Sequence, residues 1–523
     1  MGYNVNPSNK GFARSLRSQI YVDKSGLIAY TNKVLDTNQK YVCVSRPRRF
    51  GKTMTAEMLT AYYSRGCYSG NMFANLNIAS DPSYKIHLNQ YNVIFLNIQR
   101  FLSKLKKVEE LTAKIAEKVI KEIKGSYSPQ DVLTDILDDI YAEQDIPFVF
   151  VIDEWDCIFR EYKEDKITQK RYLDFLRDLL KDREYAALTY MTGILPIKKY
   201  GSHSALNMFD EFSMSDPGPL EEFVGFTQDE VNILCAKYNM SIEDMAQWYN
   251  GYHFRMIKSV YNPKSVVTAI LRGYFGNYWT KTETYEALSF YIDANFDGLR
   301  DAVIELLAGE KKCVDVSGFT NDMVTFKNYD DILTLLIHLG YLGYDVEKQE
   351  VFIPNKEISD EFVTAVKNEG WGEIAAALKA SDDLLKATWR ADSQSVAAAI
   401  EKAHNDISII RYNDENALSC VISLAYYSAR QYYTIVREMP AGKGFADLVF
   451  IPRKSHLDKP AMILELKWDL SVIAAIQQIK DKQYTEILKG YKDNALLIGI
   501  TYDKVSKRHE CTIERFTECI DRR

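Results

Sequence analysis

Hydrophobic positions along residues 1–226 fall into short runs separated by longer amphipathic stretches. Four of these runs are rich in β-branched and aromatic residues and predict buried strands at Tyr41–Ser45, Val93–Ile98, Phe148–Ile152 and Leu188–Thr192. Val108–Ile123 and Tyr172–Lys181 repeat their apolar residues with the period of a helix. The alternation of strands and helices predicts an α/β fold built on a largely parallel sheet.

The pattern beyond residue 226 divides into three further parts. A mainly helical stretch ends in an apolar helix at Ile332–Leu339 and two short strands at Tyr341–Asp345 and Glu350–Ile353, an order that resembles a winged-helix unit. Glu373–Ala399 is rich in alanine and predicts a helical connector. The remaining chain reads as helix, hairpin, strand, helix and strand. We therefore expect a first domain at 1–226, a helical lid and winged-helix-like region at 227–365, a connector at 366–395 and a C-terminal α/β domain at 396–523.

Composition limits the classes of function. The 523 residues carry a net charge of −7. A protein that coats nucleic acid needs a predominantly basic surface, so the net charge argues against that class. It does not exclude a nucleic-acid enzyme whose basic residues line one channel. The 8 cysteines form no CxxC pair, which argues against a zinc site and a disulfide framework and for a reducing compartment. No stretch has the apolar length of a signal peptide or a membrane span. We expect a soluble, cytoplasmic protein with no membrane partner.

A phosphate-binding loop is predicted directly after the first strand. Residues 46–53 read Arg-Pro-Arg-Arg-Phe-Gly-Lys-Thr, and residues 54–64 predict a helix. Such a loop needs close backbone approach, a lysine at the β- and γ-phosphates and a hydroxyl for Mg²⁺, roles that suit Gly51, Lys52 and Thr53. The alternative interpretation is a chance tripeptide in a strand-to-helix turn.

The entry to this loop departs from the usual pattern, which has a second glycine where this chain has Arg46. Pro47 biases Arg46 toward an extended backbone, so the loop does not require a left-handed glycine there. Arg48, Arg49 and Phe50 complete the predicted nucleotide-binding segment. Either one of Arg48 and Arg49 contacts the nucleotide, or both are surface charges.

Two consecutive acids end the third predicted strand. Asp153 and Glu154 follow its hydrophobic run, which suits one carboxylate for the Mg²⁺ shell and one to activate the attacking water. A strand that simply ends in a polar turn is the alternative. Thr192, at the end of the fourth strand, is a candidate sensor of the γ-phosphate or an ordinary strand terminus.

These residues resemble the AAA-ATPase-like family over about residues 10–230. The resemblance lies in Ile20-Tyr21-Val22-Asp23-Lys24, the run from Ser45 to Thr53, Val151-Ile152-Asp153-Glu154-Trp155-Asp156, Met191-Thr192-Gly193-Ile194 and Gly225-Phe226-Thr227. It implies an AAA-like P-loop ATPase domain in which the missing first glycine is a family variant. Members typically join such an ATPase to a C-terminal nuclease-like domain.

Charged residues interrupt hydrophobic strands near the C-terminus. Asp447 lies in the second arm of a predicted hairpin, at 433–438 and 445–451, and Glu465 and Lys467 share one face of the strand Ala461–Trp468. Glu415 lies on the apolar face of a preceding helix. Buried charges of this kind must be paired, bound to metal or solvated in a cleft. Three acids and a lysine suit a Mg²⁺-dependent phosphodiesterase, and an edge strand with an ordinary Glu–Lys pair is the alternative.

The ordered set of these acids, Lys467 and the later Gln478 and Tyr484 resembles the PD-(D/E)XK nuclease superfamily, over about residues 400–510. The resemblance implies a restriction-endonuclease-like α/β domain. It implies catalytic roles for Asp447, Glu465 and Lys467, metal binding by Asp447, Glu465 and Glu415, and an auxiliary role for Gln478. Mg²⁺ is the expected ion, with Mn²⁺ as a substitute.

Two functions remain open on the sequence. The first is a P-loop ATPase coupled to a metal-dependent nuclease acting on nucleic acid, with DNA the expected polymer, ATP the expected nucleotide and a homo-oligomer an open possibility. The second is a nucleotide-switched protein whose nuclease-like domain binds DNA or a partner without cleaving. The acidic net charge favours the second, because a processive nuclease usually carries more basic surface.

Overall fold

The computed structural model separates the chain into two compact units, Met1–Glu286 with Cys313–Asp360 and Ala287–Lys312 with Glu361–Arg523. It describes residues 2–197, 206–279, 298–319, 326–368, 372–406, 415–441, 443–484, 491, 494–506 and 508–516. In this part of the chain, no helix is both long enough and apolar enough to cross a membrane.

A five-stranded sheet forms the centre of the first unit, with the strand order β2-β3-β4-β1-β5. Its members are β1 (Tyr41–Ser45), β2 (Asn92–Asn97), β3 (Phe148–Asp153), β4 (Ala186–Gly193) and β5 (Asp210–Phe212). Every neighbouring pair is parallel. The predicted parallel sheet is therefore confirmed. β5 was not predicted, because a three-residue strand containing two acids gives no hydrophobic run.

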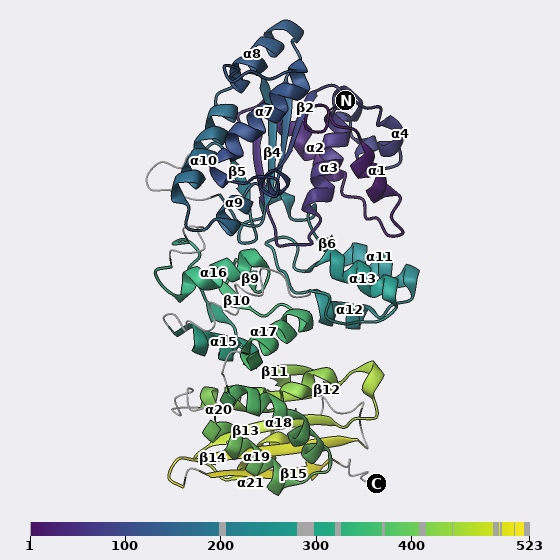
Figure 1. Ribbon diagram of the computed structural model, residues 1–523. Coiled ribbons are helices and arrows are strands. Elements are labelled where there is room, and N and C mark those ends of the chain that lie inside the picture. Colours follow the sequence, from purple (N-terminus) through teal and green to yellow (C-terminus); the bar gives the residue numbers. More distant parts are fainter. Residues whose placement is uncertain are drawn as a thin grey trace. The chain divides into compact units, whose positions relative to one another are not determined.

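Helices cover both faces of this sheet (Figure 1). α7 (Leu111–Lys124), α8 (Leu133–Gln144) and α10 (Lys166–Leu180) pack on one face and share a core with β2 and β3. α3 (Lys52–Tyr63) lies on the other, with α1 (Lys10–Leu16) and α2 (Gly26–Val34) beside it. α10 begins six residues before the predicted Tyr172 because the Asp165 side chain accepts a hydrogen bond from the Thr168 N–H and caps the helix.

A mainly helical region completes the first unit. Its helices are α11 (Gln228–Tyr238), α12 (Ile242–Tyr249), α13 (Pro263–Arg272) and α16 (Tyr329–Leu339). The first three pack into one small core with Ile20, Phe226 and Tyr261. The predicted order of a helix followed by a hairpin is present: α16 precedes β9 (Gly343–Asp345), which pairs in antiparallel fashion with β10 (Glu350–Phe352).

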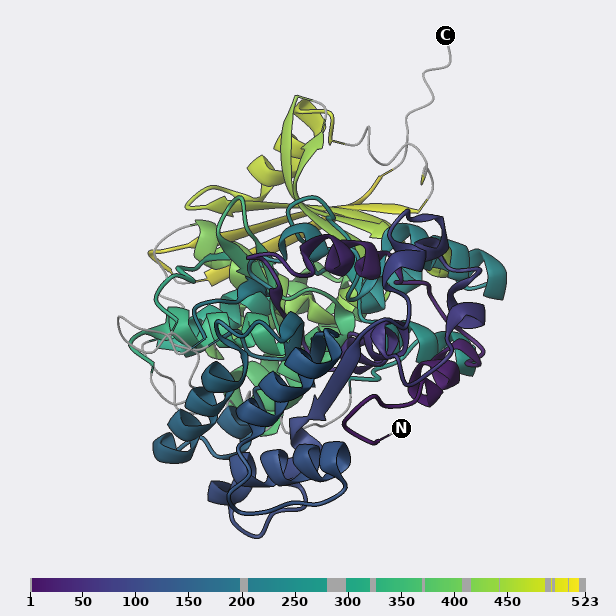
Figure 2. The same cartoon turned by 90° about the horizontal axis from the view of Figure 1, so that it is seen from above.

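The second unit is built on a mixed sheet whose strands follow one another in sequence order. They are β11 (Tyr433–Ala441), β12 (Gly444–Pro452), β13 (Ala461–Trp468), β14 (Ala495–Asp503) and β15 (Arg508–Arg515). β13 and β14 are parallel and the other pairs antiparallel. Seen from above, the strands form a single layer (Figure 2). This mixed sheet confirms the predicted C-terminal α/β domain.

Two groups of helices pack against the sheet of the second unit. α21 (Val472–Asp481) lies on the face that carries Ile463 and Leu497. α18 (Gly372–Trp389), α19 (Ser393–Asp406) and α20 (Glu415–Ala425) also belong to this unit. The stretch Glu373–Ala399, predicted to be helical, belongs to α18 and α19, which are separated where Ala391 adopts a left-handed φ of 58°. Residues expected to form a connector thus contribute to the packing of the second unit.

Candidate functional sites

The loop between β1 and α3 has the backbone of an anion-binding turn. Gly51 caps α3 with a left-handed φ of 95°, a conformation that favours glycine. Lys52 and Thr53 are the first two residues of α3. N–H groups of a first helical turn lack partners within the helix, so this turn presents donors and the positive end of the helix dipole to a ligand.

The ammonium group of Lys52 lies across this loop. Its Nζ donates to the Pro47 carbonyl at 2.9 Å, and the side chain is buried. Burial lowers the pKa of Lys52, while the negative charges of Glu154, Asp156 and Asp153 act in the opposite direction. The structure therefore holds a buried cation beside the helix N-terminus, as a phosphate lysine requires.

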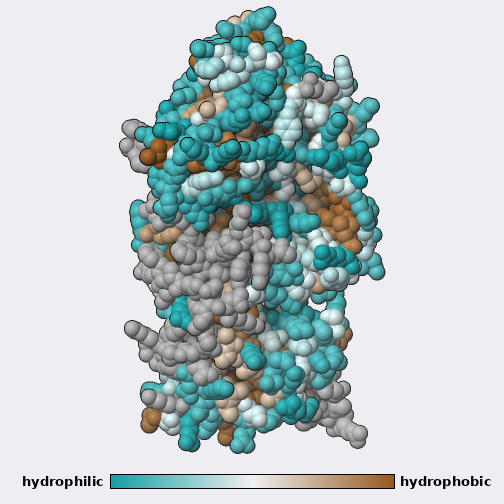
Figure 3. Space-filling view, viewed as in Figure 1, coloured by the Kyte–Doolittle hydropathy of each residue, from teal (hydrophilic) through white to brown (hydrophobic). Residues whose placement is uncertain are grey.

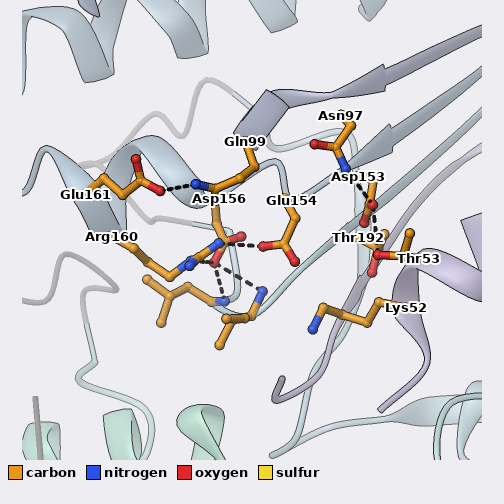
Figure 4. A network of polar contacts seen from close by, with 12 residues as sticks. Lys52, Thr53, Asn97, Gln99, Asp153, Glu154, Asp156, Arg160, Glu161 and Thr192 are labelled. Atoms are coloured by element: carbon orange, nitrogen blue, oxygen red, sulfur yellow. Dashed lines mark hydrogen bonds and ion pairs between the residues drawn. The ribbon is translucent and has the colours of Figure 1, made fainter. Parts of the chain in front are cut away.

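Asp153, at the end of β3, faces Thr53 across the loop (Figure 4). Its Oδ2 accepts hydrogen bonds from the Thr53 hydroxyl at 3.0 Å and the Asn97 amide at 2.9 Å. Its Oδ1 is buried and has no hydrogen-bond partner among the described residues. Burial, reinforced by the neighbouring Glu154 charge, raises the pKa of Asp153 to about 6. This carboxylate suits a cation that would engage the second oxygen.

Glu154 sits on a left-handed backbone, with a φ of 54°, immediately after β3. Its Oε2 forms an ion pair with Nη2 of Arg160, and Nε of Arg160 donates to Oδ2 of Asp156 at 3.0 Å (Figure 4). Asp156 also accepts the main-chain N–H groups of Ile194 and Leu195. Glu154 is thereby tied through two side chains to the segment that follows β4.

Thr192 lies within β4 opposite Asp153 in the strand register, and Figure 4 places it next to Thr53. It is fully buried, and its hydroxyl donates to the Val44 carbonyl at 3.1 Å. The hydroxyl thus bridges two strands at the end of the sheet that carries the candidate site. Its lone pairs are the part of the group that a ligand or water would engage.

Arg46, at the position of the absent first glycine, is completely buried. Its Nη1 donates to the carbonyls of Ser45, Phe212 and Ser213, each at 2.9 Å. Its guanidinium also stacks over the Phe254 ring, with 5.1 Å between the Arg46 Cζ and the ring centroid. Arg46 therefore joins β1 to the β5 end of the sheet and to the helical region.

The other residues of the loop point in different directions. Arg49 adopts a left-handed φ of 72° and donates to the Tyr278 carbonyl of the helical region. The Phe50 ring is buried edge-on against Tyr252, with centroids 5.2 Å apart. Arg48 borders the pocket described next.

A pocket of about 920 Å³ opens over this loop. Its lining includes the loop itself with the start of α3, residues 18–24 of the N-terminal segment, and residues of α13. The lining combines the polar residues Glu154, Lys52 and Thr53 with the apolar residues Ile20, Val267 and Leu271. The surface of this unit shows a hydrophobic patch in the region of α11 and α13 (Figure 3). A pocket lined by both charged and apolar side chains suits a nucleotide.

In the second unit, β12, β13 and α21 bring four of the predicted residues together. Asp447 accepts the Leu466 N–H through its Oδ2 at 2.6 Å. Glu465 is buried, and its Oε1 accepts from Nζ of Lys467 at 3.1 Å and from the Gln478 amide. Its Oε2 is buried without a hydrogen-bond partner among the described residues. Burial, with the Asp447 charge adding to it, raises the pKa of Glu465 to about 7.

The remaining predicted ligand of this site is Glu415, the first residue of α20. Its side chain lies outside the described part of the structure. Within the described residues, no group of three or more His, Cys, Asp or Glu side chains is close enough to hold a metal ion. The geometry therefore supplies Asp447 and Glu465 as candidate metal ligands, and the role of Glu415 stays a prediction.

Three residues of the first site were not singled out by the sequence patterns: Asn97, Asp156 and Arg160. Asn97 ends β2 in register with Asp153, and a polar residue at the carboxyl end of a strand beside β3 was the available signal. Asp156 and Arg160 are four residues apart, a spacing that is compatible with an ion pair on a helix. Their link to Glu154 depends on the turn after β3, which has no sequence signature.

Comparison with known proteins gives two family matches. Residues 13–202 match the AAA-ATPase-like family, described as a predicted AAA-ATPase, and residues 413–511 match the PD-(D/E)XK nuclease superfamily. Among curated proteins, no relative matches the chain.

Two solved structures from Aeropyrum pernix show weak similarity to the chain, with low sequence identity and low TM-scores. The ORC2 protein, in ADPNP-ADP complexes, is 12% identical over 69% of this chain and 98% of its own, with a TM-score of 0.30. The ORC1 protein, in complex with DNA, is 10% identical over 70% of this chain and 98% of its own, with a TM-score of 0.27.

Proposed function

We propose that this protein couples ATP binding and hydrolysis to metal-dependent cleavage of nucleic acid. The proposal starts from the AAA-ATPase-like domain at residues 13–202 and the PD-(D/E)XK nuclease superfamily domain at residues 413–511. DNA is the proposed substrate and Mg²⁺ the proposed ion. The ATPase would act as the switch and the C-terminal unit as the phosphodiesterase.

One observation carries the proposal: each unit holds a buried carboxylate that leaves one oxygen without a partner among the described residues. The oxygens are Oδ1 of Asp153 and Oε2 of Glu465. Burial raises the pKa of these groups to about 6 and about 7, which expresses the cost of ionising a carboxyl group away from solvent. A divalent cation at each carboxylate would offset that cost, so the residues fit the ion that the two families imply.

In the first unit, the phosphates would lie against the first turn of α3, with Lys52 at the β- and γ-phosphates. Thr53 and Asp153 would hold the ion, which supplies charge neutralisation at the phosphate oxygens. Glu154 lines the pocket and would orient the attacking water and accept its proton. Thr192 would sense the γ-phosphate through a bridging water, which would donate one hydrogen bond to the Thr192 oxygen and the other to a phosphate oxygen.

The loop arginines and the apolar lining would hold the rest of the nucleotide. Arg48 borders the pocket and would contact a phosphate, while Arg49 would link the loop to the helical region through the Tyr278 carbonyl. Phe50 packs against Tyr252 and would keep Gly51 in place. The apolar lining, which includes Ile20 and Val267, would enclose the base.

In the second unit, Asp447 and Glu465 would hold the catalytic ion, with Glu415 as a further ligand. A divalent ion supplies an activated water and charge stabilisation in such a centre, and Mn²⁺ would substitute for Mg²⁺. The Lys467 ammonium would orient that water and stabilise the charge that develops on the phosphate. Gln478 would fix the orientation of Glu465 through its amide.

The test measures ATP turnover and the nicking of supercoiled plasmid with Mg²⁺ or Mn²⁺, each with and without ATP. Lys52→Ala should abolish turnover and the effect of ATP on nicking, and Lys467→Ala should abolish nicking while turnover continues. Exposed Lys33→Ala and Lys402→Ala are matched controls in the two units. Undiminished nicking by Asp447→Ala would contradict the proposed nuclease centre.

A second candidate is a nucleotide-switched protein whose C-terminal unit binds DNA or a partner without cleaving. It is favoured by the engagement of Glu465 Oε1 with both Lys467 and Gln478, together with the net charge of −7. The same plasmid assay separates the two. ATP-dependent DNA retention without cleavage under either metal would favour this second function.

A further inference from the structure

The side chain of Glu154 is held by a rigid chain of contacts that ends on the main chain. Nη2 of Arg160 contacts Oε2 of Glu154, and Nε of the same guanidinium contacts Oδ2 of Asp156. The Arg160 side chain is 6% exposed and that of Asp156 is 0% exposed, whereas that of Glu154 is 24% exposed and lines the pocket. Figure 4 shows the three groups side by side, with Lys52 on the other side of Glu154 from Arg160.

We propose that Arg160 is a positioning residue for Glu154: it holds one carboxylate oxygen so that the other faces the attacking water. The inference rests on the proposed ATP hydrolysis and names the residue that orients its general base. Arg160 is not itself a catalytic residue here, because its guanidinium contacts two carboxylates and is almost fully buried.

The geometry of the guanidinium group explains why an arginine occupies this position. Its donors form a fixed planar fork, so anchoring Nε on Asp156 also fixes the direction in which Nη2 points. A lysine at this position would offer one ammonium group for two carboxylates. The ion pair with Asp156 therefore fixes the guanidinium of Arg160, and the fixed guanidinium holds the Glu154 carboxylate.

The anchor itself is fixed to the central sheet. Asp156 accepts the N–H groups of Ile194 and Leu195 at 3.1 and 2.8 Å, directly after β4 ends at Gly193. A Cβ at Gly193 would come within 2.6 Å of Oδ1 of Asp156, so this close approach requires glycine. β4 pairs with both β1 and β3. The contacts of Asp156 therefore fix Glu154 relative to the strands that carry the phosphate loop and Asp153.

A structural role alone leaves one contact unexplained. Arg160 already has an ion pair with the buried Asp156, whose Oδ2 also accepts two main-chain N–H groups. Arg160 nevertheless extends its second arm to a partly exposed acid on a left-handed backbone at the pocket edge. A left-handed, non-glycine residue is costly, and such strain persists where the surrounding structure fixes it.

The experiment compares steady-state ATP turnover and fluorescent-nucleotide binding in the full-length protein. Arg160→Lys should lower kcat about tenfold and Arg160→Ala about a hundredfold, losses that do not exceed the roughly 10²- to 10⁴-fold that general acid–base catalysis contributes. The Kd for nucleotide should change less than about twofold, because Arg160 reaches the phosphates only through Glu154. Arg177→Ala, which removes a half-exposed arginine from α10, is the matched control and should keep the kcat of the original protein.

A double-mutant cycle distinguishes positioning from a general structural effect. Glu154→Gln alone should lower kcat strongly, and adding Arg160→Ala to it should cause no further loss, since the residue acts only through Glu154. Equal losses in both backgrounds, or an undiminished or raised kcat in Arg160→Ala, would overturn the inference while ATP hydrolysis stands. If Arg160→Ala does not fold, Arg160→Lys in the same two backgrounds decides, because it retains the charge beside Asp156. A protein that binds ATP but never turns it over would overturn the proposed hydrolysis, and with it this role for Arg160.

Discussion

The Thr53 hydroxyl donates a hydrogen bond to Oδ2 of Asp153 at 3.0 Å, so the two proposed magnesium ligands of the first unit are hydrogen-bonded to each other. The bond joins the first turn of α3 to the end of β3. It leaves Oδ1 of Asp153 buried without a partner among the described residues, in a position where ionisation is costly without a cation.

Asp153→Asn should therefore stabilise the nucleotide-free protein at pH 8 while abolishing ATP turnover. Burial raises the pKa of Asp153 from 3.8 to about 6 in the folded state. A raised folded pKa gives a contribution to stability that is fully present below the unfolded pKa and is lost as pH rises through about 6. The gain at pH 8 should be up to about 3 kcal/mol in the free energy of unfolding and should shrink toward pH 4.

The measurement is thermal or urea unfolding in EDTA, without nucleotide, at pH 4, 6 and 8. Exposed Asp135→Asn is the control and should show no comparable pH-dependent gain. A lower stability of Asp153→Asn than of the unsubstituted protein at pH 8 would mean that a negative charge at this position stabilises the ligand-free fold.

Gly51→Ala should weaken nucleotide binding through the backbone alone. Gly51 has a φ of 95°, and a Cβ there would meet no atom within 4 Å. The cost is therefore the left-handed conformation itself, about 1–2 kcal/mol, and relaxation of that strain would rotate the N–H groups away from the phosphates. Titration with a fluorescent nucleotide should show at least a tenfold rise in Kd. Gly70→Ala, at a glycine with ordinary φ and one distant side-chain contact, is the control.

Arg46→Gly, which restores the usual glycine of the loop, should destabilise the protein. Arg46 is buried and donates to three main-chain carbonyls, so its loss leaves polar groups without partners and opens a cavity. We expect a loss of at least about 3 kcal/mol in the free energy of unfolding. Urea unfolding measures this loss, and Arg17→Gly, which replaces an exposed arginine at the end of α1, is the control. Equal stability of the two variants would mean that the buried bonds of Arg46 contribute nothing net.

Arg46 also marks the limit of what the sequence could predict. Its neighbour Pro47 indicated an extended backbone, but burial follows from carbonyls at Phe212 and Ser213 and a ring at Phe254, all far along the chain. Strand β5, which supplies one of those carbonyls, is too short and too charged to predict. The long hydrophobic strands β1, β3 and β4 were predictable because burial on both faces leaves a continuous apolar run.

The convergence of the C-terminal acids was easier to anticipate than the contacts around Glu154. A hairpin followed by a strand brings Asp447 and the Glu465-x-Lys467 pair onto neighbouring antiparallel strands, and strand period fixes their common face. Glu154 instead depends on a left-handed turn and on an arginine from the next helix. Turn conformations of this kind are set by tertiary contacts, so no spacing rule reveals them.

Gln478→Ala should slow nucleic-acid cleavage without weakening nucleic-acid binding. The Gln478 amide donates to Oε1 of Glu465, the oxygen that Lys467 also contacts. Without that donor, Glu465 can rotate toward Lys467, and the proposed metal ligand loses its fixed orientation. Removal of a group that orients a metal ligand typically costs about 10- to 100-fold in metal affinity or activity. Single-turnover nicking across a Mg²⁺ titration should show a higher metal requirement, whereas gel-shift affinity in EDTA stays unchanged. Gln477→Ala, on the exposed side of α21, is the matched control. A Gln478→Ala protein with the original metal requirement and nicking rate would remove Gln478 from the site.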